Sequence, residues 1–83
     1  MKINEQLHII KRNEEIFLTN LENGDVYELN DVTLSIFELS MKVNTTQELA
    51  DMVFSLYKDS SEDYTKNDLV DFIDWLRENG FII

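Results

Sequence analysis

The fold of this chain is decided by residues 24–32, which read Gly24-Asp25-Val26-Tyr27-Glu28-Leu29-Asn30-Asp31-Val32. This stretch predicts a turn, a short strand that ends at Leu29, and a helix that begins at Asn30. Asparagine is a strong N-cap because its side-chain oxygen accepts a helix N–H that has no partner in the first turn. Asp31 then places negative charge where the helix dipole favours it. A strand joined directly to a helix fixes an exposed strand edge beside a helical layer, and this geometry suits capture of an extended peptide.

Two further strands are predicted upstream. Residues favourable to strands cover Leu7–Arg12 and Glu15–Leu21, and the two residues between these runs predict a tight hairpin. Asn23-Gly24 predicts a second hairpin through a type I′ turn, which needs positive φ at both central residues. Asp25–Leu29 is then the third strand of an antiparallel meander, and residues 1–6 are expected to be a loose polar lead-in.

Three helices are predicted downstream, each with a capping signal at its start. Asn30 caps the first helix, Asn30–Met41, the pair Thr45 and Glu48 begins the second, and the pair Thr65 and Asp68 begins the third. Gly80 is placed to end the third helix. Residues 59–63 are expected to form a loop. Three strands followed by three helices predict one α+β domain, residues 1–83, with the helices on one face of a small sheet. This architecture is similar to a winged helix-turn-helix whose wing strands come first.

The third strand is expected at an edge of the sheet, because strands that follow one another in sequence usually pair. An uncovered edge offers unpaired N–H and C=O groups. If Tyr27 and Leu29 face the helices, Val26 and Glu28 face away, since side chains alternate along a strand. On the second strand the alternation leaves two choices for the side chains that face away: Ile16 with Leu18, or Phe17 with Leu21. Such a face is left bare or is covered by a partner.

The third helix carries an unusual aromatic flank. At ~100° per residue, Leu69, Ile73 and Leu76 centre its buried face. One flank carries Asp68, Phe72 and Trp75, with Asp71 just beyond. Trp75 can be read as a boundary aromatic that shields a small core. It can equally be read as the wall of a groove beside the third strand, in which the two aromatics form an apolar floor and the two aspartates an acidic rim. A peptide hot spot requires this combination.

Several phrases along the chain, in order, resemble those of one family. They are Tyr27-Glu28-Leu29-Asn30, Ile36-Phe37, Thr46 with Glu48-Leu49, Leu56-Tyr57, Asp71-Phe72 with Trp75-Leu76, and Gly80-Phe81. Together they resemble the PqqD-like proteins, the RiPP recognition elements that hold the leader of a precursor peptide for modifying enzymes. The resemblance runs from Ile9 to Ile83. It implies that a leader is held as an added strand between the third strand and the third helix.

The resemblance therefore favours a non-enzymatic protein that binds a precursor leader and presents it to a leader peptidase, a cyclase or a radical-SAM enzyme. Among discrete members, those of lasso-peptide systems are the narrower expectation. The expected peptide-binding residues are Asp25, Val26, Tyr27, Glu28, Leu29, Asp68, Asp71, Phe72 and Trp75. The chain is expected to be a monomer or weak dimer. Two alternatives stay open: an acidic adaptor or inhibitor that docks on a basic protein, and a winged-helix regulator that binds DNA.

Composition narrows these choices. The net charge of −10 disfavours nucleic acid and anionic membranes, because the sequence offers no basic patch. The chain has no cysteine, and its single histidine, His8, stands apart from any catalytic partner. Asp59, Glu62 and Asp63 lack the spacing of a calcium loop. We therefore expect no catalytic residue, no metal and no cofactor, and the absence of a signal peptide predicts a cytoplasmic protein.

Overall fold

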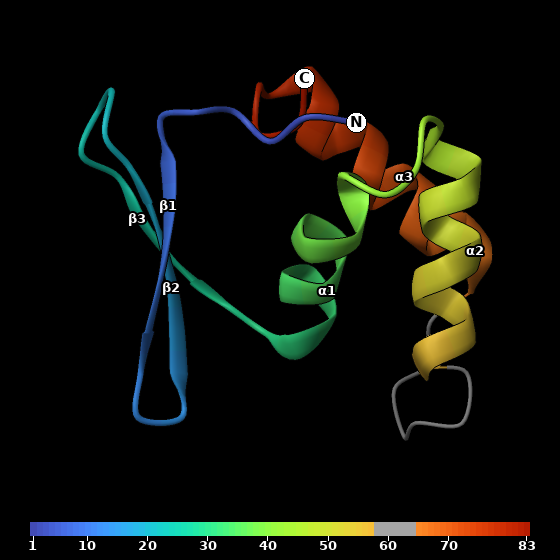
Figure 1. The fold of residues 1–83 in the computed structure, drawn as a ribbon, viewed down its shortest axis with the longest axis horizontal. Coiled ribbons are helices and arrows are strands. Elements are labelled where there is room, and N and C mark those ends of the chain that lie inside the picture. The colour runs from blue at the N-terminus through green and yellow to red at the C-terminus, as the bar shows by residue number, and fades with distance from the viewer. Residues whose placement is uncertain (58–64) are drawn as a thin grey trace.

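The computed structural model of the chain describes residues 1–57 and 65–83. Its elements are β1 (Leu7–Arg12), β2 (Glu15–Asn20), β3 (Val26–Leu29), α1 (Asp31–Ser40), α2 (Thr46–Tyr57) and α3 (Lys66–Glu78). The sheet lies on one side and the helices gather on the other (Figure 1). This arrangement confirms the predicted α+β order of three strands and three helices. The loop expected at residues 59–63 lies outside the described residues.

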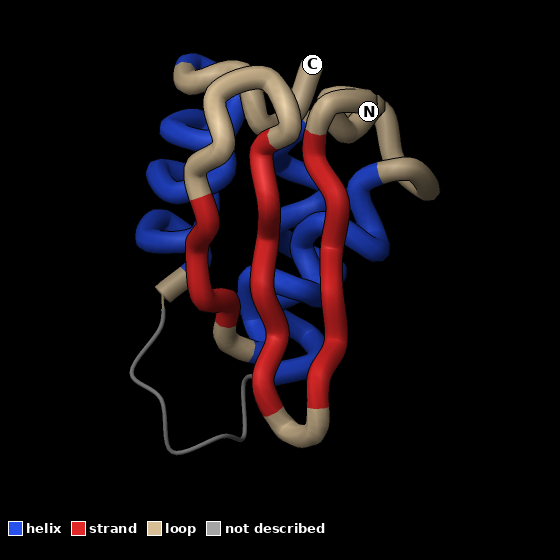
Figure 2. The backbone as a smooth tube through the Cα atoms, turned by 90° about the vertical axis from the view of Figure 1, so that its left-hand side faces the viewer, coloured by secondary structure: helices blue, strands red, loops and turns tan. Residues whose placement is uncertain are grey.

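The sheet is antiparallel with strand order β1-β2-β3, so β3 lies at an edge (Figure 2). Leu18 of β2 is opposite Ile9 and Tyr27 and is almost fully buried, so this row of side chains faces the helices. Phe17 is opposite Ile10 and therefore faces away. Of the two choices left by the sequence, the structure has the one in which Phe17 points outward.

The two hairpins differ from each other. Arg12 pairs with Glu15 across a two-residue turn in which Asn13 has a φ of 58°, as the tight hairpin requires. The type I′ turn predicted at Asn23-Gly24 is wrong, because of these two residues Gly24 alone has positive φ, 79°. The connection instead spans residues 21–25, and β3 begins at Val26.

Asn20 accounts for this wider loop. Its carbonyl accepts the Gly24 N–H at 2.8 Å, and its side chain accepts the Glu22 N–H at 2.9 Å. The Asn23 side chain accepts the Asp25 N–H at 2.9 Å. These local side-chain bonds satisfy the backbone of a longer turn, which competes with the two-residue alternative.

Side-chain caps begin the helices where the sequence predicted them. Asn30 accepts the Thr33 N–H at 2.8 Å at the start of α1. Thr45 accepts the Glu48 N–H at 3.2 Å at the start of α2. At the start of α3, Thr65 and Asp68 form a reciprocal capping box. The caps satisfy N–H groups that the helices themselves leave without a partner.

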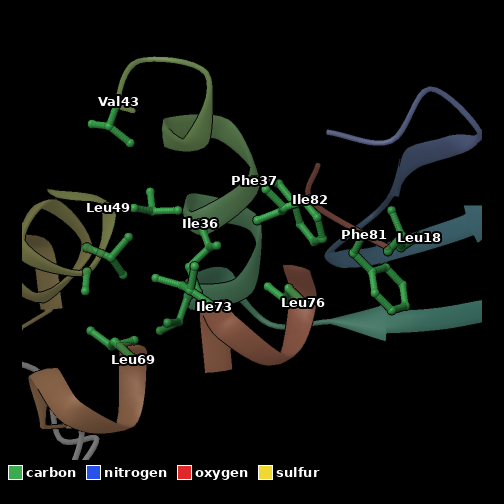
Figure 3. Close-up of a cluster of buried hydrophobic side chains, with 13 residues drawn as sticks. Leu18, Ile36, Phe37, Val43, Leu49, Leu69, Ile73, Leu76, Phe81 and Ile82 are labelled. Atoms are coloured by element: carbon green, nitrogen blue, oxygen red, sulfur yellow. The ribbon is translucent and has the colours of Figure 1, made fainter. Parts of the chain in front are cut away.

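The core lies between the helices and the inner face of the sheet. Ile36, Phe37, Leu49, Val53 and Ile73 have no exposed surface. Figure 3 shows Ile36, Leu49 and Ile73 together among the helices. Of the helices in residues 1–57 and 65–83, none has both the length and the apolar character that crossing a membrane would need.

The first residues lie beside the end of the chain rather than forming the loose lead-in expected from the sequence (Figure 1). Ile3 and Ile82 form an isolated antiparallel bridge. The Asn4 N–H donates to the Phe81 carbonyl at 3.0 Å, and the Ile83 N–H donates to the Lys2 carbonyl at 2.7 Å. Backbone pairing over a long sequence separation therefore holds both ends and fixes the position of Phe81.

Candidate functional site: a groove between β3 and α3

The outer edge of β3 is the first component of the site. The Asn20 N–H donates to the Asp25 carbonyl at 2.8 Å, which places Asp25 at a hydrogen-bonded position in the register of β2 and β3. Hydrogen-bonded pairs alternate along antiparallel strands, so Tyr27 and Leu29 also direct their backbone groups toward β2. The N–H and C=O groups of Val26 and Glu28 consequently point outward. No other strand of the described residues pairs with these groups, so they form an open hydrogen-bonding edge.

Four aromatic rings form the second component. The rings of Tyr27 and Phe81 meet edge to face, with centroids 5.6 Å apart. Phe81 stacks on Trp75 at 5.7 Å, and Trp75 stacks on Phe72 at 6.2 Å. The series runs from β3 across the C-terminal segment to α3. Although they stack on one another, Phe72 is 36% exposed and Trp75 48% exposed.

These rings line a pocket of about 170 Å³. Its walls come from the sheet, from α1, from α3 and from the C-terminal segment: Leu18, Tyr27, Glu28, Leu29, Thr33, Phe37, Phe72, Trp75, Leu76 and Phe81. A second pocket of about 300 Å³ adjoins it and shares Thr33 and Phe72; its other walls are Asn30, Val32, Asp68 and Leu69. We call the two pockets together the β3–α3 groove.

Most of the peptide-binding residues expected from the sequence lie along this groove, but not all. Tyr27, Glu28, Leu29, Asp68, Phe72 and Trp75 line the groove. The Asp25 carboxylate, just before β3, accepts a hydrogen bond from the Tyr27 hydroxyl at 3.2 Å. Val26 belongs to the open edge through its backbone, while its side chain is 61% exposed on the outward face of the sheet. Asp71 is exposed and lines neither pocket.

Phe81 is the main residue that the sequence reasoning missed. Gly80 has a φ of 78°, its N–H donates to the Arg77 carbonyl, and the Phe81 N–H donates to the Leu76 carbonyl at 2.9 Å. This is a Schellman motif, which turns the residue after the glycine back onto the last turn of the helix. The motif therefore directs Phe81 toward the sheet, where Figure 3 shows it beside Leu18. The sequence signal that could have located Phe81 is a glycine at the end of a helix followed directly by an aromatic residue.

Thr33 was also missed, and its position follows from the cap of α1. The Asn30 side chain accepts from both the N–H and the hydroxyl of Thr33 at 2.8 Å. These two bonds hold the first turn of α1 directly against the end of β3. Thr33 thereby becomes a shared wall of the two pockets.

The charged side chains along the groove are acidic. Asp68 lines it, and Glu28 lines it from β3 although its side chain has the register of the outward face of the sheet. Among residues 1–57 and 65–83, no Lys or Arg lines either pocket. Among residues 1–57 and 65–83, the side-chain ion pairs are Lys11 with Glu38 at 3.6 Å and Lys66 with Asp51 at 3.1 Å, both outside the groove lining. Partial burial and the neighbouring Asp25 carboxylate raise the pKa of Tyr27 above its ordinary value. The Tyr27 hydroxyl donates to the Asp25 carboxylate.

Within the described residues, no cluster of three or more His, Asp or Glu side chains is placed to hold a metal ion. His8 is exposed and pairs with Thr19 of β2. Both residues belong to the face of the sheet that points away from the helices. The groove thus offers backbone hydrogen bonds, aromatic surface and negative charge. These properties suit binding of an extended chain.

The comparisons with known proteins agree with this geometry. A family model described as "Coenzyme PQQ synthesis protein D (PqqD)" matches residues 15–82. Among solved structures, "TbiB1 in Complex with the TbiA(beta) Leader Peptide" is 20% identical, has a TM-score of 0.67, and is matched over 99% of this chain and 94% of that one. "Lasso peptide synthetase B1 complexed with the leader peptide" is 16% identical, has a TM-score of 0.65, and is matched over 99% and 95%. No curated protein matches the sequence.

Proposed function

We propose that this chain, which belongs to the PqqD family, binds the leader segment of a ribosomally made precursor peptide and presents it to the enzymes that mature the peptide. The observation that carries this proposal is the open edge of β3 beside an aromatic groove. The two solved structures of similar fold support it, because both are complexes with a leader peptide. One of them is a lasso peptide synthetase component, so a lasso-peptide system is the narrower proposal.

Binding proceeds by strand addition. The outward N–H and C=O groups of Val26 and Glu28 pair with the leader backbone, which supplies affinity without regard to sequence. Alternate leader side chains then enter the groove, and these supply selectivity. The peptide-binding residues in this proposal are Asp25, Val26, Tyr27, Glu28, Leu29, Asp68, Asp71, Phe72 and Trp75, to which the groove geometry adds Thr33 and Phe81.

Amide hydrogen exchange tests this mode of binding. The probe is the N-terminal segment of the peptide encoded by a short precursor gene, where one is found beside the gene for this chain. On its addition, exchange at Val26 and Glu28 should slow, because their outward N–H groups become bonded. Tyr27 and Leu29 serve as internal controls, since their N–H groups already face β2. Protection confined to α2 or α3 would rule out strand addition.

The chain itself performs no chemistry in this proposal, and its partner is a leader peptidase, cyclase or radical-SAM enzyme. Within the described residues, the groove is built from aromatic, aliphatic and acidic side chains together with Asn30 and Thr33, and no nucleophile there is held by a base. Precursor incubated with purified protein should keep its mass. A mass change that survives repurification and the His8→Ala substitution would show that the chain is an enzyme.

A further inference from the structure

Glu28 occupies a defined place in the strand that a leader would extend. Its ladder partner is Phe17, so its side chain lies on the outward face of the sheet, while its backbone belongs to the open edge. Among residues 1–57 and 65–83, no Lys or Arg nitrogen lies within 4.0 Å of its carboxylate. Glu28 is exposed. A solvated carboxylate without a cationic partner therefore stands directly beside the position of an added strand.

Strand geometry determines what this carboxylate meets. In an added strand, the residue opposite Tyr27 points inward, toward the pocket lined by Phe72, Trp75 and Phe81. The next residue is opposite Glu28 and points outward, on the same face as the carboxylate. The residue after that is opposite Leu29 and points inward again, toward Thr33 and Phe72. This alternation holds whether the added strand is parallel or antiparallel.

The charge of the neighbourhood favours one kind of side chain at the middle position. Asp25 and Asp31 flank β3, Asp68 lines the groove, and all three are exposed. A cation opposite Glu28 gains from the direct cross-strand contact and from this surrounding field. An acidic residue at the same position is repelled by both.

We propose that the peptide recognised in the groove carries a Lys or Arg immediately next to its apolar anchor residue, with the anchor in the aromatic pocket and the cation opposite Glu28. This inference rests on the proposed function, and it adds the chemical class of the ligand. The aromatic pocket supplies most of the affinity, while Glu28 selects among peptides that all possess an anchor. A single exposed cross-strand ion pair changes affinity by about two- to fivefold, and exchanging attraction for repulsion changes it by about tenfold.

Selection from a random library tests the proposal without knowledge of the natural leader. The probe is a displayed library of random 12-residue peptides, selected on immobilised full-length protein at about 0.1 M salt. Peptides that compete with one another and protect the amides of Val26 and Glu28 are sequenced. They should show an apolar residue with a Lys or Arg beside it, enriched several-fold over the unselected library. At about 1 M salt the basic preference should fade and the apolar preference should remain, because screening acts on exposed charges.

Two variants with the same change in net charge separate a local contact from the general field. Glu28→Lys should reverse the preference, so that Asp or Glu is enriched beside the anchor. Glu15→Lys is the control: Glu15 lies on β2 opposite Arg12, away from the β3 edge, and its replacement should leave the basic preference in place. Both substitutions are at exposed strand positions, and amide spectra of each variant establish that the fold is retained.

The outcomes distinguish this inference from the proposed function. Selected peptides with an apolar anchor but no basic neighbour, or an unchanged basic preference in Glu28→Lys, would overturn the inference and leave the proposed function standing. An equal loss of the basic preference in Glu15→Lys would assign this preference to net charge and would also overturn the inference. A selection that yields no peptide protecting β3 would overturn both.

Discussion

The two faces of α3 both carry bulky apolar side chains, yet they differ sharply in exposure. Leu69, Ile73 and Leu76 are buried against the other helices and the sheet. Phe72 and Trp75 lie on the neighbouring flank and are 36% and 48% exposed. The buried face holds the fold together, whereas the exposed flank is covered only in part, by the stacked ring of Phe81. Large aromatic residues left exposed beside an open strand edge indicate a binding surface.

The difference arises from the sheet rather than from the helix. β3 spans Val26–Leu29 and is shorter than β1 or β2, and the sheet ends there. A fourth strand would lie over the aromatic flank, but the described chain supplies none. The core face and the groove face of α3 should therefore respond differently to substitution.

The largest effect is expected from Ile73→Ala on the core face. Ile73 has no exposed surface, and removal of a buried aliphatic side chain costs about 2–5 kcal/mol through lost contacts and the cavity that remains. A chain of this size has little stability in reserve, so a substantial unfolded population should appear. Urea denaturation followed by Trp75 fluorescence measures the change. A loss below about 1 kcal/mol would mean that this face can be repacked.

Trp75→Ala on the groove face should instead act on binding. If Trp75 is a hot spot, leader affinity falls by ~2 kcal/mol or more, which is about thirtyfold in Kd, while thermal stability changes less than in Ile73→Ala. Calorimetric titration measures the affinity. Leu56→Ala on α2 is a matched control, because Leu56 is also exposed but lies outside the groove lining.

Trp75 also packs on Phe81, so melting curves must show that Trp75→Ala is folded. A folded variant that binds the leader as tightly as the parent would eliminate the groove. The remaining candidate would be the outward face of the sheet, around Val26 and Glu28.

Gly80 links the two faces, because its turn carries the chain from the end of α3 to Phe81. A side chain at Gly80 would meet no atom within 4 Å, so the cost of Gly80→Ala comes from the positive φ alone. We expect a loss of about 1 kcal/mol in thermal unfolding, and a smaller loss for Gly80→Asn, since asparagine tolerates this region better. Equal losses for both variants would point to a cause other than backbone conformation.

The smallest effects are expected at the acidic rim. Asp68→Asn keeps an oxygen that can still accept the Thr65 N–H, so the cap of α3 is retained. For a basic leader, the association rate should fall by less than tenfold and its dependence on salt should weaken, because rim charges mainly steer encounter. Stopped-flow fluorescence of Trp75 measures both. Asp71→Asn should change the association rate less, since Asp71 lines neither pocket. A larger change in the rate for Asp71→Asn than for Asp68→Asn would show that the acidic rim includes Asp71.

Local signals in the sequence predicted much of this molecule. Asn30 and Thr65 specified helix starts through side-chain bonds within three residues, and the spacing of Leu69, Ile73 and Leu76 identified the buried face of α3. The turn at Asn23-Gly24 was predicted incorrectly, because bonds made by Asn20 and Asn23 favour a longer loop. Such competition between turns depends on small energy differences that a dipeptide signal does not contain.

By itself, the sequence determined the order of elements, the edge position of β3 and the presence of an aromatic, acidic flank on α3. These features depend on contacts between residues near one another in the chain. Tertiary structure decided that Phe81 joins Tyr27 and Trp75, that Phe17 faces away from the helices, and that the first residues pair with the last. Those outcomes depend on how the C-terminal segment docks between the sheet and α3. Contacts between distant segments arise only when the whole core is assembled, so no local pattern specifies them.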